Sequence, residues 1–219
     1  MKDGKKEELF SFVERLKITT IQDFTRFALE NVPEYFWTLP STTMRGPGHA
    51  HDELLVDHVI TCAKIADSVA NQQFDKYWAQ IQKDQLLSAI LLHDGWRCGY
   101  LGKEERITQE DVKRRGGCED LIGNLKTSKH HPEVGYKALF GLVCKYNNQK
   151  SIRYKICRDE YLNILLGVRH HYGPWTADDV GVKGSPILGE RFDSVVAQVH
   201  TIDYHQSRNS ALQYRKDHE

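Results

Sequence analysis

The sequence predicts an all-α fold in a single domain. Apolar residues recur at spacings of three and four through most of the chain, and no stretch alternates apolar and polar residues as a half-buried strand does. The 219 residues, 40% of them hydrophobic, are enough for one sizeable core. We therefore expect a helical bundle in which residues 1–34 form N-terminal helices packed on a main domain of residues 35–210, with residues 211–219 as a C-terminal tail.

Two short helices are expected at the N-terminus, over residues 7–16 and 20–32. The second ends before Pro33, because proline lacks the N–H group that would continue the helix. Residues 35–52 are predicted to form a loop, since prolines and glycines interrupt any helical pattern there. Neither of the two helices carries a likely metal ligand.

Two further helices each carry polar side chains where the apolar face continues. Residues 52–73 form an amphipathic pattern, and His58 lies on its apolar stripe. Residues 83–94 are apolar over most of their length and end in His93 and Asp94. Both helices are therefore expected to direct polar groups toward the core.

The next two predicted helices each adjoin a pair of histidines, the first at its beginning and the second at its end. In residues 127–146 a helix is expected to start at Pro132, which is favoured in a first turn, directly after His131. Residues 160–175 form a core helix that ends at His170 and His171, before a glycine and a proline.

The last predicted helix covers residues 190–212 and places Asp203 on or beside its inward stripe. Charged residues 102–117 and 147–155 are predicted to be surface loops. Six polar side chains are thus directed inward: His58, His93, Asp94, His131, His171 and Asp203.

These six inward-facing groups predict a metal site. A single buried histidine is more often a hydrogen-bonded core residue, so the prediction depends on the whole set. Buried polar groups without partners are costly, and a divalent metal would be a partner for several at once. Imidazole nitrogens combined with carboxylate oxygens suit Mn²⁺, Fe²⁺, Ni²⁺ or Zn²⁺ better than Ca²⁺.

Composition limits the partners that the chain is expected to have. Thirty basic and thirty acidic residues cancel, which argues against an extended nucleic-acid surface or a membrane surface. The N-terminus is charged and the longest apolar run is far shorter than the ~20 residues of a membrane span, so we expect a cytoplasmic protein, with an oligomer left open. The five cysteines include no CxxC pair, which favours reduced structural thiols over disulfides or a thiolate zinc site.

The order His58, then His93-Asp94, then Asp203 resembles the metal site of the HD-domain superfamily of metal-dependent phosphohydrolases, whose members are all-α. The segment "YFWTLPSTT" is similar to one in small, single-domain HD proteins of bacteria and phages. The resemblance covers roughly residues 35–210. It implies that these four residues are the defining ligands of a divalent metal.

Two more motifs resemble those of HD proteins with two metals. "HHPEVG" and "HHYGPW" match elements that supply additional ligands, which implies a second ion with Asp94 as the bridge. Within each histidine pair, the spacing to Pro132 favours His131 as the ligand and the spacing to "GPW" favours His171, which leaves His130 and His170 as residues that could orient the ligands. The implied cofactors are divalent ions of Mn, Fe, Ni, Co, Mg or Zn. The chain lacks the GYP segment of the HD-GYP phosphodiesterases, and Arg97 stands where the nucleotidases with an HDxxE motif have glutamate.

The activity that the resemblance implies is hydrolysis of a phosphoester or phosphoanhydride of a small nucleotide-type substrate by a metal-activated hydroxide. The expected catalytic residues are Asp94, Arg97 and Lys129. The alternative is a regulatory or scaffold protein that binds a nucleotide with little or no hydrolysis. The base, the number of phosphates and the native metal stay open.

Five side chains are candidates for contacting the substrate. Arginine binds phosphate through two N–H groups at once, and tryptophan stacks on nucleobases, although each residue here is also explained as an ordinary surface or packing residue. The candidates are Arg97, Arg45, His49, Trp175 and Arg208.

Overall fold

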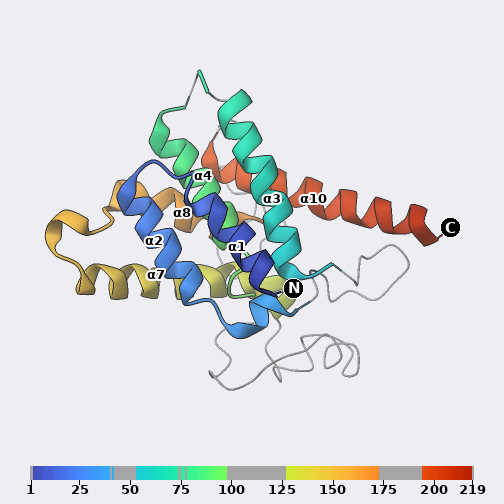
Figure 1. Cartoon of the computed structure of the whole chain (residues 1–219), viewed down its shortest axis with the longest axis horizontal. Helices are drawn as coiled ribbons and strands as arrows, with labels where there is room; N and C mark the ends of the chain where they lie inside the picture. Colours follow the sequence, from blue (N-terminus) through green and yellow to red (C-terminus); the bar gives the residue numbers. More distant parts are fainter. Residues whose placement is uncertain are drawn as a thin grey trace.

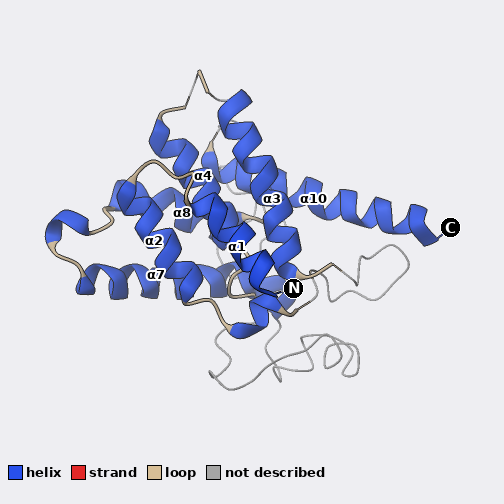
Figure 2. Cartoon of the chain, in the orientation of Figure 1, coloured by secondary structure: helices blue, strands red, loops and turns tan. Residues whose placement is uncertain are grey.

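The structure, a computed structural model of the chain, describes residues 2–39, 41, 53–73, 75–76, 78–97, 127–172 and 194–218. Within these ranges the chain forms seven α-helices and no β-strand (Figure 2), which confirms the predicted all-α class. In the same part of the chain, no helix combines the length and apolar character needed to cross a membrane.

The helices appear in the order in which the sequence predicts them. The α-helices are α1 (Lys2–Val13), α2 (Thr19–Glu30), α3 (Leu55–Ser68), α4 (Gln80–Leu92), α7 (Thr127–Gln149), α8 (Arg158–His170) and α10 (Val195–His218). Three short helices accompany them: η1 (Glu34–Trp37), η2 (Val69–Gln73) and η3 (Ile152–Tyr154). The predicted surface loop 147–155 therefore includes the end of α7 and a short helix.

The central helix of the bundle is α4, which contacts α2, α3, α8 and α10 (Figure 1). Every residue from Asp84 to Leu92 is buried, as expected for a helix packed on all sides. Because α4 ends within the bundle, His93 and Asp94 also lie inside the protein, where each is less than 5% exposed.

A glycine allows α8 to approach α4 and α10 closely. A Cβ atom on Gly167 would lie 3.0 Å from Ala89 Cβ and 3.1 Å from a methyl group of Val199, closer than side chains normally pack. The three helices that meet at Gly167 are the ones that lead to His93, His171 and Asp203.

Helix α7 begins one turn earlier than the sequence predicted. It starts at Thr127 and contains Pro132, so the predicted start at Pro132 is wrong. Pro132 is the sixth residue of α7, so it keeps φ in the helical range but removes the backbone hydrogen bond that its N–H would otherwise make. His131 therefore lies on the helix rather than before it.

Helix α10 continues through His218, beyond residue 210 where the sequence placed the end of the main domain. Figure 1 shows its C-terminal end extending away from the other helices. The helices α1 and α2 pack against α3, α4 and α7.

Asp84 connects α4 to the segment between α1 and α2. Its Oδ2 accepts hydrogen bonds from the backbone N–H groups of Lys17 at 2.8 Å and Ile18 at 2.7 Å. Because the substitution Asp84→Ala removes both bonds from a buried carboxylate, it is expected to lower the free energy of unfolding by about 2–3 kcal/mol in urea denaturation. The control Asp75→Ala removes an exposed ion pair with Lys83 and should change stability much less; equal effects would contradict this role.

Candidate metal centre

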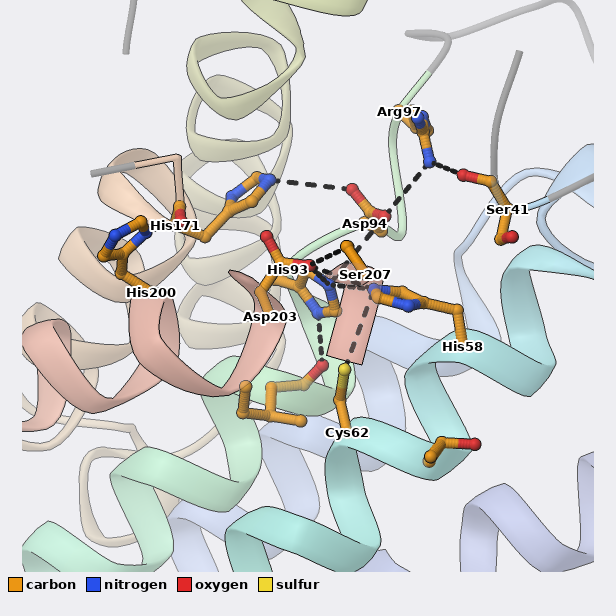
Figure 3. Close-up of polar contacts among 12 residues, drawn as sticks. Ser41, His58, Cys62, His93, Asp94, Arg97, His171, His200, Asp203 and Ser207 are labelled. Atoms are coloured by element: carbon orange, nitrogen blue, oxygen red, sulfur yellow. Dashed lines mark hydrogen bonds and ion pairs between the residues drawn. The ribbon is translucent and has the colours of Figure 1, made fainter. Parts of the chain in front are cut away.

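A first group of donor atoms lies where α3, the end of α4 and α10 meet (Figure 3). His58 Nε2 lies 3.1 Å from Asp203 Oδ1 and 3.3 Å from His93 Nε2, although 145 positions separate His58 from Asp203. Cys62, one turn after His58 on α3, completes the group. All four donor atoms lie within 4.8 Å of one another, and all four residues are buried.

A second group lies beside the first and consists of Asp94, His131 and His171. Asp94 Oδ1 is 3.0 Å from His131 Nε2 and 3.7 Å from His171 Nε2, and the two histidine nitrogens are 2.8 Å apart. The start of α7 and the end of α8 therefore bring their histidines to the carboxylate that follows α4.

The carboxylate of Asp94 lies between the two groups. Its Oδ1 faces His131 and His171, whereas its Oδ2 lies 3.8 Å from His93 Nε2 and 3.4 Å from Arg97 Nη1. The four ligands expected from the HD motif are thus divided: three belong to the first group, and Asp94 belongs to the second while it contacts the first.

Backbone hydrogen bonds orient two of the histidine rings. His93 Nδ1–H donates to the carbonyl of Ile90, and His171 Nδ1–H donates to the carbonyl of Val168, each at 2.7 Å. With Nδ1 protonated, a neutral ring presents the Nε2 lone pair to the centre, which is the tautomer that a metal requires. His200 on α10 donates from Nδ1 to the carbonyl of His171 and so holds the end of α8 in place.

The two carboxylates are ionised although they are buried. Burial by itself would raise the pKa of Asp94, but Arg97 and His93, with His131 at hydrogen-bond distance, lower it well below its ordinary value. Burial would likewise raise the pKa of Asp203, and the hydrogen bond from His58 and the nearby His93 outweigh it and lower the pKa. The centre therefore carries two negative charges in the protein interior.

His58 in the first group and His171 in the second group differ in protonation. Burial, with His131 nearby, lowers the pKa of His171 to about 3, so this ring is neutral. Burial also lowers the pKa of His58, but Cys62 and the hydrogen bond to Asp203 raise it by more, to well above its ordinary value. His58 therefore holds a proton in the metal-free cluster, and a bound metal ion would displace that proton.

The chemistry of the donor atoms fits a metal ion. Within the described residues, Asp94 Oδ1 accepts no well-aligned hydrogen bond, although His131 lies close to it. A buried anionic oxygen that lacks a well-aligned donor is costly, and a cation would compensate that charge. These buried histidine, cysteine and aspartate groups could hold a metal ion.

Arg97 lies beside the centre rather than in solvent. Its side chain is 16% exposed, and Nη1 approaches Asp94 Oδ2 and donates to the backbone carbonyl of Ser41 (Figure 3). The N–H of Ser41 in turn donates to the carbonyl of Glu53 just before α3, at 2.7 Å. Arg97 thus connects the carboxylate at the centre to the chain that precedes α3.

Tyr172 follows the last helical residues of α8 and covers the second group. The centroid of its ring lies 4.6 Å from that of His131 and 5.0 Å from that of His171, edge-on to both. Burial raises the pKa of Tyr172 to about 12, so its hydroxyl remains a neutral hydrogen-bond donor.

Among the other predicted site residues, Arg208 is the only one with a described side chain. Arg45, His49 and Trp175 lie outside the described residues, and Lys129 lies on α7 with only its backbone described. Arg208 is exposed, and its guanidinium lies 5.3 Å from an aromatic ring centroid on its own helix.

Sequence reasoning missed Cys62, which it treated as a structural thiol. Cys62 Sγ lies 3.7 Å from His58 Nε2 and belongs to the first donor group. The available signal was its position four residues after His58, because residues at that spacing share one face of a helix.

No protein-family model, no curated protein and no solved structure matches the chain.

Proposed function

We propose that the chain is a metal-dependent phosphohydrolase of the HD type that hydrolyses a phosphoester or phosphoanhydride of a small nucleotide-type molecule. The observation that carries the proposal is the pair of buried donor groups with the carboxylate of Asp94 between them. A protein that used this region only for packing would have no need of two ionised carboxylates among four histidines.

The donor atoms divide naturally between two divalent ions. His58, His93 and Asp203 would hold one ion, and Asp94, His131 and His171 would hold the other, with the Asp94 carboxylate close to both groups. Two such ions would lower the pKa of a water molecule and compensate the charge that develops on a phosphoryl group.

The chain supplies binding groups at the edge of the centre. Arg97 places a permanent positive charge next to Asp94. A phosphate bound at the centre would be within its reach, and the planar guanidinium can donate two hydrogen bonds to phosphate oxygens at once. The hydroxyl of Tyr172 is a second donor on the side of His131 and His171. Burial of the surrounding side chains strengthens these electrostatic interactions, because little water is present to screen them.

The test is a screen of phosphate release and product formation with protein purified without chelator. The substrates are nucleoside mono- and triphosphates, cyclic nucleotides and short oligonucleotides, each assayed with Mn²⁺, Mg²⁺, Fe²⁺, Co²⁺ and Ni²⁺. We expect metal-dependent hydrolysis of at least one class. Bound nucleotide without hydrolysis would favour a regulatory or scaffold protein, and a protein that binds no metal would contradict the proposal.

Arg97→Lys is expected to weaken substrate binding or slow turnover with the metal content unchanged. Lysine keeps the charge but loses the planar pair of donors. The stabilisation of the transition state should therefore fall by about 1–3 kcal/mol, which is a decrease in kcat/KM of roughly 5- to 150-fold. Steady-state kinetics with elemental analysis measure both quantities. Arg153→Lys, on the exposed η3, is the matched control, and wild-type kinetics for Arg97→Lys would show that the planar pair of donors of Arg97 does not bind the substrate.

A further inference from the structure

The first donor group contains a sulfur atom as well as nitrogen and oxygen. His58 and Cys62 lie on successive turns of α3, and both side chains face the end of α4 and the middle of α10 (Figure 3). Cys62 is completely buried. In the second group, the donors among the described residues are nitrogen and oxygen only.

Four of the six separations among these donor atoms are close to those between ligands of one metal ion. Ligands bound at ~2.0–2.1 Å through nitrogen or oxygen, and at ~2.3 Å through sulfur, lie about 3.3–3.6 Å apart when they surround one ion tetrahedrally. The observed separations from His58 Nε2 are 3.1 Å to Asp203 Oδ1, 3.3 Å to His93 Nε2 and 3.7 Å to Cys62 Sγ. The separation between His93 Nε2 and Asp203 Oδ1 is 3.8 Å.

We propose that Cys62 binds the first metal ion as a thiolate, together with His58, His93 and Asp203, and thereby makes this half of the centre selective for Zn²⁺ over Mg²⁺ and Mn²⁺. The inference rests on the proposed metal centre. Binding breaks the S–H bond of Cys62, forms a sulfur–metal bond and releases the thiol proton to solvent, without any change of oxidation state. Thiolate ligands favour zinc, whereas oxygen-rich sets favour magnesium and manganese.

The two halves of the centre therefore differ in their preference for metals. The half with Cys62 offers one sulfur, two nitrogens and one carboxylate, whereas Asp94, His131 and His171 offer a harder set. A protein loaded with a mixture of ions is expected to hold zinc in the first half and to accept other divalent ions in the second.

The experiment is X-ray absorption at the zinc edge on the full chain loaded with one equivalent of Zn²⁺. We expect a sulfur atom at ~2.3 Å from zinc. With Co²⁺ in place of zinc, a sulfur-to-cobalt charge-transfer band should appear in the near ultraviolet. Cys62→Ala should remove both signals and weaken zinc binding, while binding of the second ion is retained.

Matched controls identify which cysteine supplies the sulfur. Cys144→Ala and Cys157→Ala change exposed thiols, and Cys98→Ala and Cys118→Ala change the other two cysteines of the chain. All four variants should keep the sulfur signal. A signal that is lost in one of these four variants instead would overturn the proposal, and it can be read even if Cys62→Ala does not fold.

The outcomes separate this inference from the proposed phosphohydrolase activity. Zinc surrounded only by nitrogen and oxygen in an active enzyme would overturn the thiolate ligand and leave the function in place. A sulfur signal from Cys62 in a protein that hydrolyses none of the substrates would support the thiolate ligand and count against the function. A protein that binds no zinc would overturn the thiolate ligand.

Discussion

Asp94→Ala is expected to abolish metal-dependent phosphate release and most metal binding while the helices remain folded. Asp94 contacts both donor groups and is the only carboxylate of the second group among the described residues, so its removal disrupts both halves of the centre. Elemental analysis, phosphate release and far-ultraviolet circular dichroism measure the three quantities. Full turnover by this variant would refute the proposed mechanism.

The matched control for Asp94→Ala is Asp75→Ala, which removes an exposed carboxylate and should leave both metal content and turnover unchanged. If Asp94→Ala loses helical signal and Asp75→Ala does not, a second variant at the same position tests the metal binding. Asp94→Asn then keeps the size of the side chain and removes its charge, and it should also bind less metal.

His131→Ala and His171→Ala are each expected to lower bound metal from about two ions to about one and to reduce turnover by orders of magnitude. Both rings belong to the second group, so either substitution would remove a ligand of the second ion. The pKa of the attacking water molecule would then be lowered by one ion instead of two. Metal content by elemental analysis and kcat by phosphate release test the expectation. Unchanged metal content in both variants would make the centre mononuclear and these histidines structural.

The neighbouring histidine provides a close control. His170 is buried beside His171 but belongs to neither donor group, so His170→Ala should retain both ions. His205→Ala, on the exposed side of α10, should change neither metal content nor turnover. A loss of metal in His170→Ala equal to that in His171→Ala would mean that the effect comes from a disturbed end of α8.

The sequence predicted much of the fold because periodicity reveals which face of a helix is buried. The apolar run of α4 ends in His93 and Asp94, and the structure has both residues in the interior. The spacing from the "GPW" segment favoured His171 over His170, and His171 is the one in the donor group. Patterns along one helix are therefore enough to nominate individual donors.

Other features depend on contacts between segments, which periodicity does not encode. The grouping of Asp94 with His131 and His171 follows from how α8 packs against α4 and how α7 packs against α8. The bonds from Asp84 to the backbone before α2 could not be found from a pattern either, because their partners lie 66 and 67 positions away. Cys62 was overlooked for a different reason, since cysteine on an apolar face is usually a small hydrophobic residue.

The convergence of donors from five separate segments, between His58 and Asp203, also has a consequence for the lifetime of the protein. These donor atoms are close together only in the folded chain, so ions bound to them would stabilise the folded state relative to the unfolded one. At a free ion concentration one hundred times the Kd, that stabilisation is about 2.7 kcal/mol. Starvation for the ion would then increase the unfolded fraction available to cellular proteases, and the abundance of the protein would follow the supply of its metal.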